Sequence, residues 1–322
     1  MSFSTNVKKE LSEQLSSSRH CQLAELAAFV CTIGIVLTIK EGKYKLIFQT
    51  DNIAAARKSF VLIKEAFGIS PKVAVKRHFG GSKSKSFRIE VENTEDAARI
   101  LKALKLIDDG GNYIERTDFV NAMLVKNSCC KKAFIRGIFI TSGSVTDPNK
   151  PYHFEIVCQN DSKAQQLKDI ILTFGIEARV VLRKKHSVLY IKGGELISDM
   201  LRIMEASRSV IFLENIRVEK EVRGNVNRVN NCDNANIAKT AQAAVEQSEY
   251  IRYIFERNGF AMLPDNLKEL AELRLEFPEA TIKELGMKLN PPLGKSGVNH
   301  RLNKLKDISR TLRENEEREN DS

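Results

Sequence analysis

Two widely separated segments of this 322-residue chain repeat one apolar helical pattern and close on a glycine. The first spans residues 23–34 and the second spans residues 133–143. In each segment a small residue stands six positions before the closing glycine, Ala28 in the first and Gly137 in the second. A small residue, an apolar turn and a glycine allow two helices to approach closely and end together. The pattern therefore predicts a pair of packed helices, one from each half of a duplication.

The repeat continues beyond these helices in a fixed order. Alternating strands are expected at 44–51 and 152–161, each followed by a helix that stops at a Phe-Gly-Ile triplet, 67–69 and 174–176. Two further strands follow in each copy, 72–76 with 86–91 and 178–183 with 187–191, and closing helices are expected at 95–106 and 195–206. The second strand of the first hairpin is the hardest to place. Helix-strand-strand-helix-strand-strand-helix thus occurs twice, which predicts an α+β fold built from an αββαββα repeat.

The paired helices resemble those of the LAGLIDADG homing-endonuclease fold. In that family a carboxylate just before the final glycine holds the catalytic metal ion. Here those positions are Ile33 and Ser142, and neither side chain can present a negative charge to a hard cation. The resemblance implies that the scaffold is retained and the nuclease chemistry is lost, so no catalytic residue, metal ion or cofactor is expected.

Composition limits the class of protein. The length exceeds one typical core, so two or three domains are expected. No apolar run reaches the roughly 18–20 residues of a membrane span, and residues 1–19 predict a helix rather than a secretory leader. The six cysteines include no CxxC, the adjacent Cys129 and Cys130 have poor disulfide geometry, and the five histidines are scattered. We therefore expect a reducing cytoplasm and no zinc site.

The net charge of +10 is concentrated in the two equivalent hairpins. Residues 72–88 hold six Lys or Arg and no acid, and residues 179–192 hold five and no acid. Basic ribbons can enter the major groove and neutralise phosphates, although lysines also guard exposed sheet edges. Repetition at matching positions favours contact with DNA or another polyanion. The candidate secondary DNA contacts are Lys76, Arg77, Lys83, Lys85, Arg183, Lys184 and Lys185.

Residues 217–236 are rich in asparagine and arginine, with isolated valines between them. That composition suggests an extended linker rather than a packed helix. Asp233 is a candidate N-cap for a helix over residues 237–258. The linker would join the second repeat, 127–216, to a C-terminal domain at 237–313; the first repeat is expected at 20–110.

The C-terminal domain has the pattern of a helix-turn-helix. Helices are expected at 265–276, at 281–289 with a capping box from Thr281 to Glu284, and from 296 to about 312. One face of the third helix, Val298, Leu302, Leu305 and Ser309, is expected to be buried. Its exposed side offers Ser296, Asn299, His300, Asn303 and Lys304 to base edges, while Lys295, Arg301 and Lys306 can hold phosphates. An ordinary three-helix bundle with a polar face is the alternative. The acidic tail, 314–322, is expected to be disordered.

A degenerate LAGLIDADG repeat followed by a helix-turn-helix is similar to the WhiA family of DNA-binding regulators of Gram-positive bacteria. The resemblance rests on residues 2–4 with 7–8 and 10–11, 134–139 with 143–144, 190–194, 222–230 and 291–302. It implies a transcription factor tied to sporulation in actinomycetes and to cell division and chromosome segregation elsewhere. The family's helix-turn-helix maps onto about residues 280–313.

Three functions follow from these features. The first is a non-catalytic regulator that binds double-stranded DNA through the helix-turn-helix and is associated with the nucleoid. The second is a scaffold whose repeats dock RNA polymerase, a sigma factor or a division factor. The third is an active metal-dependent nuclease, which would need acids from elsewhere, such as Asp51, Asp147 or Asp161.

Overall fold

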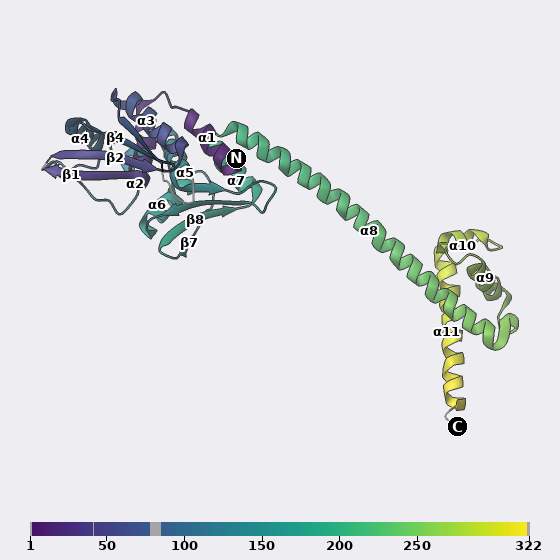
Figure 1. Ribbon diagram of the computed structural model, residues 1–322. Helices are drawn as coiled ribbons and strands as arrows, with labels where there is room; N and C mark the ends of the chain where they lie inside the picture. Colours follow the sequence, from purple (N-terminus) through teal and green to yellow (C-terminus); the bar gives the residue numbers. More distant parts are fainter. Residues whose placement is uncertain (1, 41, 78–84, 321–322) are drawn as a thin grey trace. The chain divides into compact units, whose positions relative to one another are not determined.

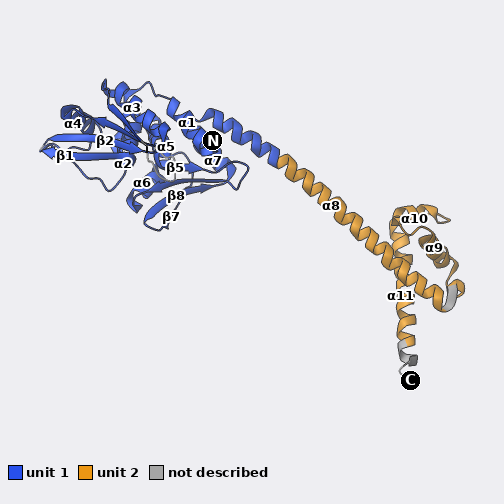
Figure 2. Ribbon diagram, viewed as in Figure 1, with its two compact units in different colours: residues 1–220 blue, residues 221–322 orange. Residues whose placement is uncertain are grey.

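The computed structural model describes residues 2–40, 42–77 and 85–320. It divides into two compact units, residues 1–220 and 221–322 (Figure 2). The first unit begins with α1 (Phe3–Glu13), and its first repeat comprises α2 (Arg19–Ile33), β1 (Gly34–Lys40), β2 (Lys43–Thr50), α3 (Ile53–Phe67), β3 (Lys72–Arg77), β4 (Lys85–Val91) and α4 (Thr94–Ala103). After η1 (Ala122–Val125), the second repeat comprises α5 (Ser128–Ser142), β5 (Gly143–Val145), β6 (His153–Cys158), α6 (Asp161–Leu172), β7 (Arg179–Arg183), β8 (His186–Lys192) and α7 (Gly194–Ile203) (Figure 1).

Each repeat forms an antiparallel sheet with the same topology. The strand orders are β1-β2-β4-β3 and β5-β6-β8-β7, so the predicted duplication of the αββαββα unit is confirmed. From the sequence, the second strand of the first hairpin is the hardest to place, but the strand expected at residues 44–51 is that second strand, β2. The strand without a predicted range is the first one, β1, which begins directly at the glycine that ends α2. Phe48 pairs with Ile89 in the first sheet and Ile156 with Leu189 in the second, and all four are buried.

The turns after α3 and α6 use glycine differently. Gly68 caps α3 with a φ of 71°, as the Phe-Gly-Ile pattern predicts. In the second copy α6 ends at Leu172, and Gly175 takes its φ of 78° in the following turn, so it is not the cap itself. A left-handed φ is easily adopted only by a residue without a Cβ.

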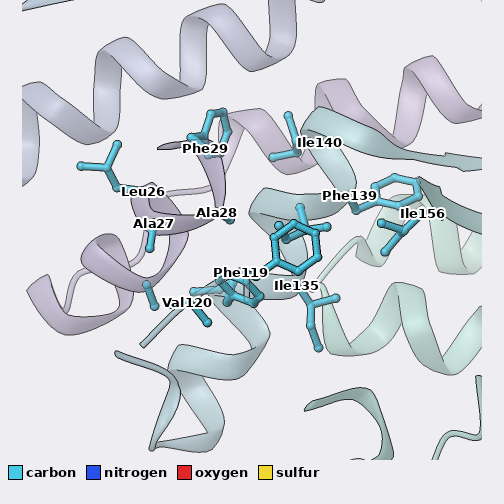
Figure 3. Packing of buried hydrophobic residues seen from close by; sticks show 14 of the residues in the cluster. Leu26, Ala27, Ala28, Phe29, Phe119, Val120, Ile135, Phe139, Ile140 and Ile156 are labelled. Atoms are coloured by element: carbon cyan, nitrogen blue, oxygen red, sulfur yellow. The ribbon is translucent and has the colours of Figure 1, made fainter. Parts of the chain in front are cut away.

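The helices α2 and α5 pack against each other in the core of the first unit, as the repeated pattern predicts (Figure 3). Both have 15 residues, and Gly34 and Gly143 are their C-caps. A Cβ built on Gly137 would lie 2.8 Å from the Ala28 Cβ and 2.9 Å from the Glu25 carbonyl oxygen. The small residue at position 137 therefore sets how closely the two backbones approach.

Three charged side chains are buried beside this close contact. The Arg136 guanidinium donates to both carboxylate oxygens of Glu25, at 3.1 and 3.2 Å, and the Lys58 ammonium lies 3.3 Å from the same carboxylate. Glu25 and Lys58 are 0% exposed and Arg136 is 2% exposed. Buried charges are tolerated only when paired, so this network fixes α2, α3 and α5 in one arrangement.

The segment predicted to be an extended linker is helical. A single helix, α8 (Ser207–Asn258), runs through residues 217–236, and Asp233 lies inside it rather than at an N-cap. Val218, Val222, Val226 and Val229 follow helical spacing along this helix, and all four are exposed. Asparagine has a modestly unfavourable helix propensity and, unlike proline, does not break a helix, which explains why the prediction was wrong.

The second unit contains the end of α8, η2 (Gly259–Met262), α9 (Asp265–Glu276), α10 (Ile282–Lys288) and α11 (Lys295–Asn320). The prediction that the tail is disordered is wrong as far as Asn320, because α11 continues to that residue. Glu316 anchors this extension: it accepts a hydrogen bond from the Tyr253 hydroxyl at 2.7 Å and pairs with Arg257 at 2.7 Å. Within the described ranges, no helix is both long enough and apolar enough to cross a membrane.

Candidate nucleic-acid interface

The first three turns of α11 present a polar stripe to solvent and an apolar stripe to the core. Val298, Leu302, Leu305 and Ser309 are 0–2% exposed, which confirms the predicted buried face. On the other side, six of the predicted DNA contacts are exposed: Lys295, Ser296, Asn299, His300, Asn303 and Lys304. In the part of the chain that the structure describes, none of these six side chains forms an ion pair. The stripe therefore offers uncommitted donors, acceptors and positive charge.

In the turn between α10 and α11, the backbone of Leu293 lies so close to residue 286 that only glycine fits there. The Leu293 amide donates to the Gly286 carbonyl at 2.8 Å. A Cβ on Gly286 would lie 2.2 Å from the Leu293 carbonyl oxygen, far inside contact distance. This close packing fixes where α11 leaves the turn, and hence the direction of its exposed stripe.

The capping box at the start of α10 is present as predicted. The Thr281 hydroxyl accepts from the Glu284 amide at 3.3 Å, and the Glu284 carboxylate accepts from the Thr281 amide at 2.7 Å. That backbone hydrogen bond lowers the pKa of the Glu284 carboxyl, so the capping group stays ionised. The box satisfies two amides of the first turn.

Two buried side chains that the sequence reasoning missed hold the domain together. Arg274 of α9 is 1% exposed and donates to the Ala280 carbonyl at 2.6 Å, which closes the turn between α9 and α10. Tyr250 of α8 donates its hydroxyl to the Leu302 carbonyl of α11 at 3.1 Å. Arg274 and Tyr250 each donate to a backbone carbonyl, which every residue carries. The sequence therefore gives no sign of these two hydrogen bonds.

Two of the predicted phosphate contacts already have partners. Arg301 is only partly exposed and donates to the Asn266 carbonyl at 3.0 Å, so it braces α11 against α9. Lys306 pairs with Glu246 of α8 at 2.6 Å. One turn beyond Asn303 the exposed Asp307 pairs with Arg310 at 3.5 Å, and the acidic residues of the tail begin at Glu314. The uncommitted positive charge therefore lies on the first turns of α11.

The basic hairpins are less uniformly cationic than their sequences suggest, because acids approach from outside the acid-free windows. Glu90 pairs with Lys45 and with Arg88, the latter at 3.0 Å. The hydrogen bond from Lys45 lowers the pKa of the Glu90 carboxyl, which keeps it charged. In the second hairpin Glu155 pairs with Arg183 at 3.2 Å. The sheets therefore carry mixed rather than uniformly positive charge.

The remaining hairpin candidates lie near the turns. Lys184 and Lys185 form the exposed turn between β7 and β8, and Lys76 and Lys85 are exposed on the paired strands β3 and β4. These four lysines have no ion-pair partner among the described residues. The backbone of Arg77 pairs with Lys85, while Lys83 lies outside the described residues.

The positions that would hold a nuclease metal ion lack acids in the folded chain. Ile33 and Ser142 are the last residues of α2 and α5, the positions at which the resemblance to homing endonucleases would place metal-binding carboxylates. The Ser142 hydroxyl instead donates to the Ile138 carbonyl of its own helix at 3.1 Å. Over residues 2–40, 42–77 and 85–320, no cluster of three or more potential ligands brings Asp51, Asp147 or Asp161 together at this end.

A cluster of potential metal ligands occurs instead near the N-termini of the same helices. His20 and Cys21 of α2 meet Cys129 and Cys130 of α5, with all four candidate ligand atoms within 4.8 Å of one another. The expectation that the histidines are scattered does not hold for His20, which lies beside three cysteines. Their proximity depends on the packing of α2 against α5.

Models of three protein domains match most of the chain. The WhiA N-terminal LAGLIDADG-like domain matches residues 19–107, the WhiA LAGLIDADG-like domain matches residues 131–223, and the WhiA C-terminal HTH domain matches residues 226–309. These matches cover both repeats and the helix-turn-helix that the sequence predicts.

Individual proteins resemble the chain over nearly its whole length. It is 44% identical over 315 residues to the probable cell division protein WhiA of Lachnoclostridium phytofermentans, covering 98% of this chain and 100% of the relative. The corresponding protein of Thermoanaerobacter pseudethanolicus is 44% identical over 314 residues, covering 98% and 99%. The crystal structure of full-length DUF199/WhiA from Thermatoga maritima superposes with a TM-score of 0.57 at 26% identity, covering 97% of this chain and 99% of that one.

Proposed function

The chain belongs to the WhiA family, and from that premise we propose that it is a non-catalytic regulator that binds double-stranded DNA through α11. The observation that carries this proposal is the exposed stripe on the first turns of α11, opposite a fully buried face. Asn299 and Asn303 offer paired donors and acceptors of the kind that read base edges. Lys295 flanks them with charge that holds phosphates. Because Arg301 and Lys306 already have partners, we assign the same role to Lys304, which the sequence pattern placed at base edges.

Substitutions within the stripe separate base reading from phosphate binding. Duplexes that bind the purified full chain are first selected from a random pool, and affinity is then measured for one selected and one scrambled duplex over a range of salt concentrations. We expect Asn299→Ala to lower the ratio of specific to non-specific affinity by about 5- to 150-fold, since a base contact contributes about 1–3 kcal/mol. We expect Lys304→Ala to weaken both duplexes and reduce the salt slope by about 1.

Arg310→Ala is the matched control, because Arg310 is exposed on the same helix but lies beyond Asp307 and pairs with it at 3.5 Å. It should leave both the affinity ratio and the salt slope unchanged. If Asn299→Ala keeps the wild-type ratio of specific to non-specific affinity, and Lys304→Ala keeps the wild-type dependence of affinity on salt, then α11 does not read DNA.

The absence of cleavage is part of the proposal and rests on Ile33 and Ser142 at the helix ends. The selected duplex should remain uncut in Mg²⁺ or Mn²⁺, because no carboxylate stands where the fold holds its metal ions. The double variant Ile33→Asp with Ser142→Asp is the reference for restored acids. If the wild-type chain nicks DNA as well as that variant does, the chain is a nuclease that uses other residues.

A second role for the repeats, docking of a protein, is supported by the surface of the first sheet. Ile35, Leu37 and Ile39 of β1 are 42–54% exposed, and the neighbouring Glu90 offsets two cations of that sheet. An apolar, charge-balanced sheet suits a protein partner better than a phosphate backbone. The candidate partners are RNA polymerase, a sigma factor or a division factor.

Neutralising the hairpin cations distinguishes the two roles of the repeats. The variant in which Lys76, Arg77, Lys184 and Lys185 are replaced by glutamine should keep its DNA affinity and salt slope if the repeats dock a protein. A reduced slope would instead assign these residues to DNA.

The biological setting follows from the names of the relatives. Two relatives that are 44% identical to the chain are named probable cell division proteins, and from them we infer a role in cell division, exerted through transcription and extending to chromosome segregation. The chain would act in the cytoplasm at the nucleoid. Mapping of the bound sites across the genome, with division-gene transcripts measured after depletion, tests this setting.

A further inference from the structure

Four side chains at one end of the paired helices form a compact set of metal-ligand atoms, which we call the His–Cys cluster: His20, Cys21, Cys129 and Cys130. The His20 Nδ1 lies 3.1 Å from the Cys130 Sγ and 3.3 Å from the Cys21 Sγ. Every candidate ligand atom in the cluster lies within 4.8 Å of every other. A tetrahedral zinc ion bonded to sulfur at about 2.3 Å and to nitrogen at about 2.0 Å has its ligand atoms separated by distances of this order.

The two repeats contribute to the His–Cys cluster from equivalent positions. His20 and Cys129 each stand 14 residues before the glycine that closes their helix, and Cys21 and Cys130 each stand 13 residues before it. The pseudo-symmetry that pairs Ala28 with Gly137 therefore also brings these four side chains together. One buried and one exposed residue comes from each helix: Cys21 and Cys130 are buried, while His20 and Cys129 are exposed.

Burial opposes free thiolates in the cluster: it raises the pKa of the Cys21 thiol to about 12 and also raises the pKa of Cys130, so both are thiols until a cation binds. The helix N-termini partly offset this cost. All four residues lie in the first turn of their helices, where amides lack partners within the helix. The residues in the N-cap positions, Ser18 and Asn127, make no side-chain capping hydrogen bond. The positive ends of two helix dipoles therefore converge on the cluster without a side-chain cap, and they stabilise negative charge there.

We propose that the His–Cys cluster is a structural zinc site that joins the two repeats. Three cysteines and one histidine are a set that zinc uses in closed four-coordinate sites. Binding replaces three thiol protons, which leave to solvent, and the neutral imidazole coordinates through Nδ1. The bound unit carries one net negative charge, which the two helix N-termini offset. The exposed His20 and Cys129 leave a route for the ion to enter.

The site lies at the end of the helix pair opposite the degenerate nuclease positions. Between Cys21 and Ile33 the helix rises about 18 Å, at about 1.5 Å per residue. Between these ends stand the ion pair of Glu25 with Arg136 and the contact of Ala28 with Gly137. Those contacts join α2 and α5 at the middle of the two helices, and zinc would join them at their N-terminal ends. Its binding would therefore stabilise the first unit.

Metal titration of the full chain tests the proposal. The purified protein is kept under reducing conditions, and Zn²⁺ is added in competition with a chromophoric chelator. We expect one zinc ion per chain, and Co²⁺ in its place should give the visible absorption of tetrahedral cobalt thiolate. The variants Cys129→Ser and His20→Asn remove exposed ligands, so folding should be preserved. Each should weaken zinc binding by more than about 100-fold, since loss of even an outer-shell partner costs about 10- to 100-fold.

Cys232→Ser is the matched control, because Cys232 is an exposed cysteine in α8 outside the cluster. It should keep the full stoichiometry and the cobalt spectrum. Removing zinc with a chelator should lower the melting temperature of the first unit to that of Cys129→Ser, which the chelator should not change. The proposal is overturned if wild-type chain binds zinc no more tightly than the two ligand variants, if cobalt gives no thiolate absorption, or if freshly isolated protein contains a disulfide within the cluster.

Discussion

Gly137→Ala is the smallest substitution that probes the pairing of the two repeats. The new methyl group would lie 2.8 Å from the Ala28 Cβ and 2.9 Å from the Glu25 carbonyl oxygen. Carbon atoms in contact prefer about 3.5–4.0 Å, so α2 and α5 must separate locally by roughly 1 Å. The bond from Arg136 to Glu25, now 3.1 Å, spans the same two helices and would lengthen with them.

The expected cost follows from two opposed effects. Alanine favours a helix over glycine by about 1 kcal/mol, which would stabilise the variant. Overpacking a close contact costs about 1–3 kcal/mol, and loosening a buried charge pair adds to that cost because its charges lose compensation. We expect a net destabilisation of the first unit of roughly 1–3 kcal/mol. At about 2–4 °C per kcal/mol for a unit of this size, the melting temperature should fall by about 2–12 °C.

Calorimetry of the full chain measures this shift, with Gly224→Ala as the control. A Cβ on Gly224 in α8 meets nothing within 4 Å, so that variant should be equally or more stable than wild type. In the double variant with Ala28→Gly the methyl group moves from one helix to the other. The loss of unfolding free energy in the double variant should be smaller than the sum of the losses in the two single variants by at least about 0.5 kcal/mol. A Gly137→Ala protein that melts at or above the wild-type temperature would refute the close-contact reasoning.

Two further substitutions test individual contacts. Burial lowers the pKa of Lys8 to about 8 from 10.5, so Lys8→Met should stabilise the first unit at neutral pH by about 1–3 kcal/mol. Between pH 8 and 10.5 the unfolded wild-type chain binds more protons than the folded one, so the free energy of unfolding of the wild type rises with pH. In urea unfolding, the wild type should therefore approach the stability of Lys8→Met as pH rises through that window. A stability difference that stays constant with pH would contradict burial of Lys8 as the cause. Gly286→Ala places a methyl group 2.2 Å from the Leu293 carbonyl oxygen. It should lower the stability of the second unit by about 1–3 kcal/mol and weaken the specific binding of DNA. Gly294→Ala is the control, because a Cβ on Gly294 meets nothing within 4 Å, and it should preserve both stability and binding. Equal melting and binding of the two glycine variants would show that the turn is not tightly packed.

The features that the sequence predicted correctly are those encoded in local periodicity. The glycine-ended helices, the order of strands and the buried face of α11 each depend on residues a few positions apart. The helical spacing of Val218, Val222, Val226 and Val229 was also a local signal, and it indicates α8. The asparagine-rich composition of the same residues favours an extended linker, and the structure follows the spacing instead.

The features that the sequence could not predict depend on strand register and helix packing. Glu155 reaches Arg183 from a separate strand, so an acid-free window of sequence does not imply an acid-free surface. The His–Cys cluster joins two adjacent pairs that lie far apart in the chain. Its one sequence signal is the equal distance of both pairs from their closing glycines, which has meaning only once α2 and α5 are known to pack together.

The residues at the C-terminal ends of α2 and α5 also determine what the helix pair needs in order to be stable. Two carboxylates held close together at the helix ends would repel each other unless a cation lay between them. With Ile33 and Ser142 there instead, that end requires no ion, and the Ser142 hydroxyl is satisfied by its own helix. The pairing of the repeats then depends on the Gly137 contact and on Glu25 with Arg136, which lie away from the end that holds Ile33 and Ser142. A scaffold stabilised in this way can keep its shape while DNA recognition resides in a separate helix-turn-helix.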